Sequence, residues 1–136
     1  MTTEASNWGP KRAASDWFAR YLSGDKQARK EAPIARGLIG YFPNACIMVA
    51  HVSYVANEQH NPGQPMQWAF AKSTDHADCQ VRHAIDAAAS PFDDDGLLHL
   101  AKKAWRANAE LETYLLEHYP QAKPGASVTG FERKEK

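Results

Sequence analysis

Residues 74–106 read TDHADCQVRHAIDAAASPFDDDGLLHLAKKAWR, and the spacing of apolar residues in this stretch decides the fold class. Apolar side chains recur three and four positions apart on either side of the break at Ser90-Pro91-Phe92, which is the spacing of one face of an α-helix. These residues are Val81, Ala84, Ile85 and Ala88 before the break, and Leu97, Leu100, Ala101 and Ala104 after it; Leu111 and Leu115 continue the pattern beyond the stretch. The stretch therefore predicts two amphipathic helices, over residues 75–89 and 93–119, with these faces in the core.

A third long helix is predicted upstream, over residues 43–60. Pro43 suits a first helical turn, and apolar residues follow it at helical spacing. They are Ala45, Met48, Val49, Val52 and Ala56. The sequence Asn61-Pro62-Gly63-Gln64-Pro65 must end this helix, because proline lacks the N–H that a helix interior needs. Residues 66–74 are expected to form a loop.

The remaining segments complete a small all-α protein. Residues 15–22 predict a short amphipathic helix, the charged residues 26–33 predict a linker, and the polar residues 120–136 predict a mobile C-terminal tail. The sequence contains no internal repeat and no alternating strand pattern. The expected architecture is a small helical bundle, all-α, in a single domain over residues 1–119 with its core in residues 33–119.

Composition and charge exclude several classes of protein. The 136 residues fit one domain, and 16 basic residues balance 16 acidic ones, so the net charge gives no signature of nucleic-acid or membrane binding. The widely spaced Cys46 and Cys79 favour neither a disulfide scaffold nor a zinc ribbon. No apolar run has the length of a signal core or a membrane span. These features predict a soluble, cytoplasmic protein.

Potential metal ligands are crowded into the opening stretch. Six of the eight aspartates and three of the six histidines lie between Asp75 and His99. Together with the end of the upstream helix, the predicted helices carry pairs of such groups, which are Glu58 and His60, Asp75 and Asp78, and Asp95 and His99. Carboxylate oxygens from several helices suit Mg²⁺ or Mn²⁺, which bind phosphates. Lys72, Arg82 and Arg106 are then candidate partners of phosphate charge.

A simpler interpretation of the same residues remains open. Asp78 and Arg82 are four positions apart, which is the spacing of an ordinary ion pair on a helix surface. Such pairs contribute only a few tenths of a kcal/mol. Asp93-Asp94-Asp95 could likewise be no more than a cluster of acids that favours a helix N-terminus. In this interpretation the polar faces are solvated.

Three compound motifs resemble a known family. They are NEQHNPGQP over residues 57–65, the W…KSTDHADC..RH run over 68–83, and DGLLH over 95–99 with AWRA following. Residues 36–112 are similar to the phage dATP/dGTP diphosphohydrolase family, whose members resemble the wider MazG and HisE group of all-α nucleoside-triphosphate pyrophosphatases. The ExxE pair found on the first catalytic helix of that group is absent, and Glu58 is the acid available there.

The resemblance implies a metal-dependent pyrophosphohydrolase that cleaves a purine (d)NTP, with dGTP as the expected substrate, to the monophosphate and pyrophosphate. It implies Mg²⁺ or Mn²⁺ as the cofactor and a homodimer or homotetramer that completes the active site. Its expected metal ligands are Glu58, Asp75, Asp78 and Asp95. The expected catalytic residues are His83 and His99, and the expected substrate-binding residues are His60, Asn61, Trp68, Lys72, Arg82 and Arg106.

Two alternative functions remain. An HD-type phosphohydrolase would release triphosphate or inorganic phosphate and would use His76, His83 and Asp78. The adjacent His-Asp dyad that such enzymes require is not clearly present. A non-catalytic helical interaction protein encoded by a phage would instead leave its acidic faces solvated. The products formed from each nucleotide discriminate among these functions.

Overall fold

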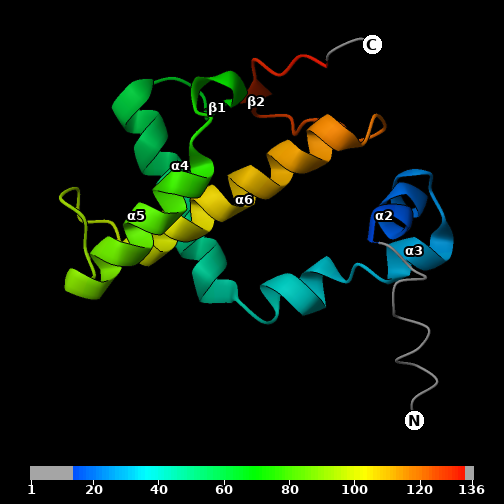
Figure 1. Ribbon diagram of the computed structural model, residues 1–136, viewed down its shortest axis with the longest axis horizontal. Helices are drawn as coiled ribbons and strands as arrows, with labels where there is room; N and C mark the ends of the chain where they lie inside the picture. Colours follow the sequence, from blue (N-terminus) through cyan, green and yellow to red (C-terminus); the bar gives the residue numbers. More distant parts are fainter. Residues whose placement is uncertain (1–13, 134–136) are drawn as a thin grey trace.

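The computed structural model describes residues 14–133, and these residues are mostly helical (Figure 1). The helices are α2 (Ala14–Leu22), α3 (Lys26–Lys30), α4 (Pro43–His60), α5 (His76–Ala89) and α6 (His99–His118), with a π-helical turn over Ala35–Ile39. The strands β1 (Trp68–Ala69) and β2 (Val128–Thr129) are two residues long, and a 3-10 turn over Phe70–Lys72 follows β1. The predicted all-α class is confirmed, as are the helix that begins at Pro43 and the break after it.

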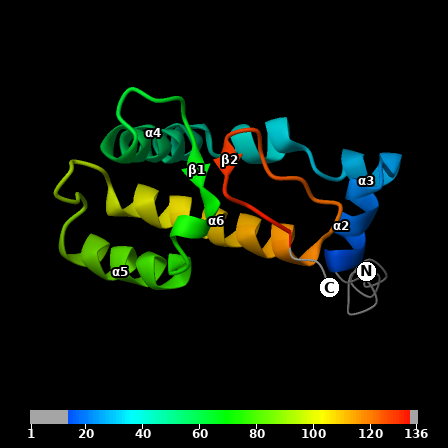
Figure 2. The same cartoon turned by 90° about the horizontal axis from the view of Figure 1, so that it is seen from above.

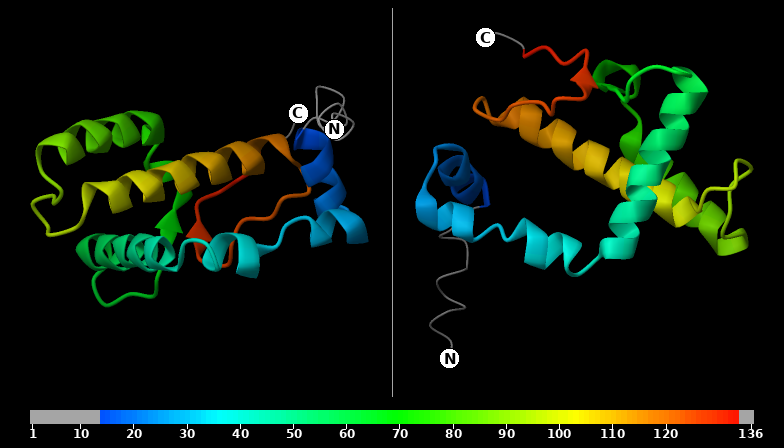
Figure 3. Two further views of the ribbon diagram at one scale, coloured as in Figure 1. Left: turned by 90° about the horizontal axis from the view of Figure 1, so that it is seen from below. Right: turned by 180° about the vertical axis from the view of Figure 1, so that it is seen from behind.

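Helix α6 lies between α4 and α5 (Figures 2 and 3). The loop of residues 90–98 turns the chain back, so that α5 and α6 form a hairpin of two helices, and α4 crosses α6 on its other side (Figure 1). The buried core consists of Val52, Leu97 and Ala101, against which Met48, Val55, Leu98 and Trp105 pack. The small side chains of Ala101 and Ala109, both buried, let the neighbouring helices approach α6 closely.

The side of α5 that faces the protein interior is not its predicted apolar side. Its buried residues are His76 and Cys79, whereas Val81 and Ile85 on the predicted core side are 59% and 65% exposed. Leu100 and Leu111 of α6 are also exposed, at 62% and 57%. The sequence-based assignment of these four residues to the core is therefore wrong for the single chain. The side of α5 that carries His76, Cys79 and His83 packs on α6 instead and contributes to the candidate site, whereas Asp78, Arg82 and Asp86 are exposed.

Helix α6 begins at His99 rather than at the predicted Asp93. Gly96 has a φ of +83°, which a residue inside a helix cannot adopt and which glycine tolerates without strain. Backbone hydrogen bonds then close the loop: the Asp93 N–H donates to Leu97 O at 2.8 Å, and the His99 N–H donates to Pro91 O at 3.0 Å. The Asp95 carboxylate accepts from the Leu97 N–H at 3.1 Å. The acids of this segment organise a tight loop and not a first helical turn.

The predicted C-terminal tail is ordered up to the last described residue. Strand β2 pairs with β1 in parallel, with Trp68 opposite Val128 and Ala69 opposite Thr129. Arg133 donates to Leu116 O at 2.6 Å, Tyr119 O at 3.3 Å and Ala122 O at 2.5 Å. Because the last carbonyls of a helix lack partners within it, this guanidinium completes the C-terminus of α6. Residues 120–133 are therefore linked both to β1 and to the end of α6.

Replacing Arg133 by alanine is expected to loosen the end of α6. The variant loses hydrogen bonds from a charged donor to three carbonyls, which together should cost about 1.5 kcal/mol of local stability. Amides near the end of α6 should then exchange with solvent about tenfold faster, as measured by hydrogen–deuterium exchange. The matched control is Lys123→Ala, which removes an exposed cation from the same segment. Equal exchange rates in the two variants would contradict the capping role.

The charged segment after α2 is also more ordered than the predicted linker. The Asp25 carboxylate accepts from the Ala28 N–H at 3.0 Å, which caps the short helix α3 and buries Ala28 completely. Phe18 of α2 meets Tyr119 edge-on with ring centroids 4.9 Å apart, which attaches this helix pair to the end of α6. Within the described residues no single helix is both long and apolar enough to cross a membrane; only Lys26–Ile39 and Pro43–His60, taken together as a pair bent by 87°, reach that length and composition.

Candidate functional site

Three buried polar side chains mark the place where α4, α5 and α6 converge. Asn57 on α4, His76 at the start of α5 and His99 at the start of α6 are each 6% exposed. Burying a polar side chain is unfavourable unless it gains hydrogen bonds. The hydrogen-bond partners of these three side chains therefore delimit the site.

His83, Asp93 and His99 form a compact cluster at one end of this region. They come from α5, the 90–98 loop and α6, and one potential ligand atom from each lies within 4.8 Å of the other two. The Nδ1 atoms of His83 and His99 are 3.0 Å apart. Since one nitrogen must donate and the other accept, one of the two rings carries its proton on Nδ1. Burial lowers the pKa of His83, and the nearby His99 and Lys102 lower it further.

Lys102 joins the two acids of the loop. Its Nζ lies 2.7 Å from Asp93 Oδ2 and 2.7 Å from Asp95 Oδ2. These hydrogen bonds hold the pKa of both carboxyl groups below their ordinary value. Burial alone would lower the pKa of Lys102, but the bonds to the two carboxylates outweigh that effect and raise it. All three groups are thus charged at neutral pH.

The Lys102→Met variant is expected to be less stable than the wild type by about 1 kcal/mol at pH 7, because two partly exposed carboxylates lose a charged partner. Groups whose pKa is lowered on folding stabilise the protein above their unfolded pKa, here 3.8, and lose that contribution as the pH falls through the folded value. Because folding raises the pKa of Lys102, its contribution to stability is fully present below its unfolded pKa of 10.5 and is lost as the pH rises through the folded value. The difference should be largest between these limits.

Urea unfolding of both proteins from about pH 3 to 8 measures this difference. Lys103→Met is the matched control, because Lys103 is the next residue of the same helix and is exposed. A stability loss in Lys102→Met that stays constant down to about pH 3 would contradict an electrostatic origin.

Arg106 of α6 contacts His76, the first residue of α5, and Asp75, the residue before it. Its Nη1 is 3.0 Å from His76 Nδ1 and 3.7 Å from Asp75 Oδ1, while Arg82 reaches the other Asp75 oxygen at 3.5 Å. A hydrogen bond from the Cys79 thiol lowers the pKa of Asp75, and the two arginines lower it further. Asp75 therefore serves as the counter-ion that positions Arg106.

His76 has a defined tautomer because of this contact. A guanidinium can only donate, so Nδ1 of His76 accepts the bond from Arg106 and the proton lies on Nε2. Burial and the charge of Arg106 both lower the pKa of His76, which favours this neutral form. Nε2 is buried and has no hydrogen-bond partner among the described residues. A buried N–H without a partner is costly, and an acceptor on a ligand would satisfy it.

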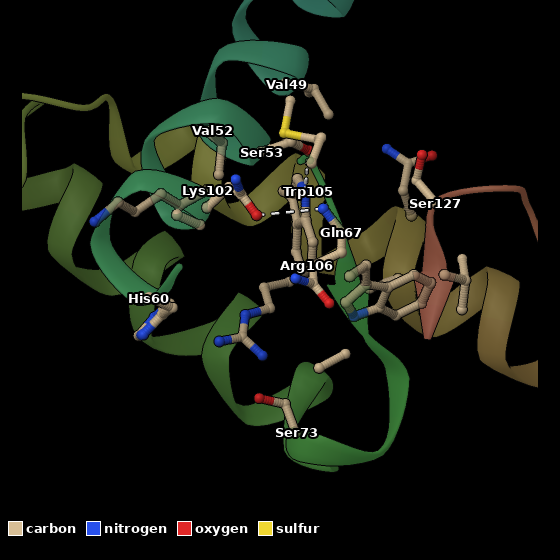
Figure 4. A pocket seen from close by; sticks show the side chains of 18 of the residues that line it. Val49, Val52, Ser53, His60, Gln67, Ser73, Lys102, Trp105, Arg106 and Ser127 are labelled. Atoms are coloured by element: carbon tan, nitrogen blue, oxygen red, sulfur yellow. Dashed lines mark hydrogen bonds between the residues drawn. The ribbon is translucent and has the colours of Figure 1, made fainter. Parts of the chain in front are cut away.

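A pocket of about 1090 Å³ opens beside these groups (Figure 4). Its walls come from α4, the β1 segment, α6 and the β2 segment, and Figure 4 shows the Arg106 guanidinium directed into the space between His60 and Ser73. The volume is slightly above the range of about 300–1,000 Å³ that is usual for small-molecule sites. Arg106, Lys72 and Lys102 place positive charge in the lining.

Two buried hydrogen-bond systems hold the pocket walls. The Asn57 amide donates to Gln64 O at 3.0 Å and accepts from the Gln67 N–H at 3.2 Å, which ties the loop after α4 back to that helix. The Trp105 indole N–H donates to Ser53 Oγ at 2.8 Å. Its ring meets the ring of Trp68 edge-on with centroids 5.8 Å apart. The β1 segment is therefore fixed against both α4 and α6.

The structure brings together most of the predicted substrate-contacting residues. The predicted site residues that line the pocket are His60, Asn61, Trp68, Lys72, His83, Asp95 and Arg106. The others, which are Glu58, Asp75, Asp78, Arg82 and His99, lie outside its lining. Of these, His99 contacts His83, and Asp75 contacts Arg106 without lining the pocket itself. The Arg82 side chain is 60% exposed.

The carboxylates that the resemblance implies for Mg²⁺ or Mn²⁺ do not converge in the single chain. Within residues 14–133, His83, Asp93 and His99 form the only group of three potential ligands close enough to hold one ion. Glu58, Asp75, Asp78 and Asp95 are not part of that group. Asp75 is paired with two arginines, and Asp95 is paired with Lys102. The implied four-acid set therefore does not fit a magnesium site here.

Sequence reasoning missed four residues that shape the site. Lys102 lies one turn of α6 after His99, and Trp105 lies one turn after Ala101. Helical spacing from His99 could therefore have indicated Lys102 as a site residue. Asp93 was assigned to a helix N-terminus, and only the Asp-Gly turn signal at Asp95-Gly96 hinted at a loop. Nothing local in the sequence marks Asn57, whose role depends on the loop that folds back on it.

Comparisons with protein families, with curated proteins and with solved structures found no match to this chain, so the resemblance drawn from its motifs stays a prediction.

Proposed function

We propose that this protein hydrolyses the α–β phosphoanhydride of a purine nucleoside triphosphate, with dGTP as the expected substrate, and releases the monophosphate and pyrophosphate. The observation that supports this most strongly is the Arg106–His76 pair. Both residues line the pocket, and they supply a guanidinium and a buried Nε2–H that has no hydrogen-bond partner within residues 14–133. Both groups donate hydrogen bonds, and the ligand that satisfies them is rich in anionic oxygen.

The rest of the pocket suits the other parts of a nucleotide. Lys72 adds a second cation that can contact the phosphate chain. Trp68 also lines the pocket, and a purine ring can stack on an indole. Asn61 is a further lining residue and offers an amide that can bind base edges. The proposed binding mode places the phosphates at Arg106 and the base toward Trp68.

The proposed reaction requires a divalent ion, as the resemblance implies. The chain supplies its own cations for the phosphates, and a metal ion also accompanies a nucleoside triphosphate in solution. The fold is proposed to be a variant of the MazG/HisE bundle, assembled as a homodimer or homotetramer. The outward apolar side chains of Val81, Ile85, Leu100 and Leu111 support such assembly, because a second copy would remove them from water.

Incubation with each dNTP tests the proposal directly. The purified protein is supplied with Mg²⁺ or Mn²⁺, and the products are separated by chromatography. Release of dGMP and pyrophosphate from dGTP is the expected outcome. Release of nucleoside and triphosphate would favour HD-type chemistry, for which His76 and His83 would have to act together. No turnover of any dNTP with either ion would overturn the proposal and favour a non-catalytic interaction protein.

A further inference from the structure

We propose that His83, Asp93 and His99 form a binding site for one divalent first-row transition-metal ion. This site differs from the four-carboxylate site that the resemblance implies, and it lies at the end of the pocket that His83 lines. The proposal does not depend on nucleotide hydrolysis. It rests on the geometry of three side chains from three separate segments, and its test uses the metal ion alone.

The distance between the two imidazoles fits adjacent positions on one metal ion. Metal–nitrogen bonds to histidine are about 2.1 Å long, so two nitrogens at a right angle around one ion lie about 3.0 Å apart. A tetrahedral angle would require about 3.4 Å for the same bonds. The observed separation of His83 Nδ1 and His99 Nδ1 is 3.0 Å. An ion there would replace the proton that the two rings share.

The third ligand is held close to this pair by the loop. Asp93 is fixed by its N–H bond to Leu97 O at 2.8 Å and by the bond from the Gly96 N–H to its carbonyl at 2.9 Å. Phe92 and Leu98 form an antiparallel bridge across the base of the same loop. Since His99 begins α6 and is buried, all three ligands stand on ordered backbone before an ion binds.

The donor set determines the class of ion. Two histidines and one carboxylate on one face of an octahedron form the arrangement that binds ions such as Fe²⁺, with the other positions open. Imidazole nitrogen also suits Zn²⁺, Ni²⁺ and Co²⁺, whereas Mg²⁺ prefers an all-oxygen shell. The site should therefore bind Co²⁺ and Zn²⁺ much more tightly than Mg²⁺.

Lys102 competes with the ion for the carboxylate. Its ammonium is 2.7 Å from Asp93 Oδ2, and it must release or share that oxygen when a cation binds. Asp95 offers Lys102 a second partner at 2.7 Å, so the lysine can stay paired after it leaves Asp93. Removing the ammonium takes away both a competitor and a repelling charge. The inference therefore predicts that Lys102→Met binds the ion more tightly, although it is less stable.

Titration with Co²⁺ and Zn²⁺ tests the site. Tag-free protein competes with a chromogenic chelator for Zn²⁺, and the weak visible absorption of bound Co²⁺ reports its coordination number. We expect one ion per chain, octahedral Co²⁺, and no displacement by a hundredfold excess of Mg²⁺. His99→Ala and Asp93→Asn should each weaken Zn²⁺ binding at least about 100-fold, since even indirect contacts to a metal ion change affinity 10- to 100-fold.

Matched variants separate this site from unspecific binding. His118→Ala removes an exposed histidine at the other end of α6, and Asp94→Asn removes the exposed acid next to Asp93, so neither should change the affinity. Lys102→Met should raise it at least about tenfold. Asp93→Asn keeps the shape of the side chain, and circular dichroism verifies that each variant is folded. Equal affinity in wild type and Asp93→Asn, or an equal loss in the two control variants, would overturn the metal site. Unchanged affinity in Lys102→Met would overturn the competition by Lys102.

Discussion

The Arg106→Met variant should hydrolyse dGTP with a kcat/KM at least about 100-fold below that of the wild type. Arg106 is the one arginine of residues 14–133 that lines the pocket, and its contacts with Asp75 and His76 fix its orientation before substrate arrives. Charge-stabilising donors that are positioned in advance act most strongly on the transition state. The loss should therefore appear in kcat as well as in KM, measured by pyrophosphate release at several dGTP concentrations.

Two further variants make this test specific. Lys103→Met removes an exposed cation from the same helix and should leave kcat/KM near that of the wild type. Arg106→Lys keeps the charge but cannot contact Asp75 and His76 together in the fixed geometry of a guanidinium, so it should restore only part of the activity. If Arg106→Met retained more than about a third of the wild-type kcat/KM, the proposed phosphate contact would be wrong.

The helices of this protein follow from local sequence, but the direction in which they face does not. Helical spacing and the prolines at positions 43, 62 and 65 were enough to predict α4 and its end. The same spacing placed Val81 and Ile85 in the core, where the structure instead puts His76 and Cys79. Periodicity distinguishes the apolar face of a helix from its polar face. The apolar face lies in the interior only if the chain buries that face against its own residues. Here the inward face carries the candidate site, and the apolar face is exposed.

The parts of the site that were predicted are those that lie close together in sequence. His83 and His99 flank one loop, and Lys72 and Trp68 precede α5 by a few residues. The parts that were missed depend on contacts between distant segments. Asn57 binds the backbone of residues 64–67, and Ser53 binds Trp105 on a helix more than fifty residues away. The pairing of residues 68–69 with 128–129 involves only two residues on each strand, which is too short for any alternating pattern to reveal.

The structure also changes the meaning of the acidic residues. Asp75 and Asp95 looked like metal ligands because of their number and spacing, but each is neutralised by basic neighbours. A carboxylate that accepts from Arg or Lys is a weaker candidate for a metal than one that faces imidazoles. Asp93 satisfies the second condition through His83 and His99, although it also bonds to Lys102. The number of acids predicted a metal site, and the neighbours of each carboxylate indicate which acid can bind a metal ion.

Trp105→Ala is expected to destabilise the protein by about 3 kcal/mol, the largest loss of stability predicted for a single residue here. The Trp105 ring packs against the core of Val52, Leu97 and Ala101 and meets Trp68 edge-on. Its N–H bonds to Ser53 on α4, so one side chain connects α4, α6 and the β1 segment. Alanine would leave a cavity among these elements. Urea unfolding followed by circular dichroism measures the change in free energy of unfolding.

Trp105→Phe divides this loss into its two causes. Phenylalanine keeps most of the apolar contact but removes the donor to Ser53 Oγ, so it should cost about 1 kcal/mol, the value for one hydrogen bond. Ser53→Ala removes the same bond from the other side and should cost about as much. Combining Trp105→Phe with Ser53→Ala should add little, because both changes break one interaction. If Trp105→Ala lost no more than Trp105→Phe, the indole would not be packing the pocket walls together, and the β1 segment would be held chiefly by its pairing with β2.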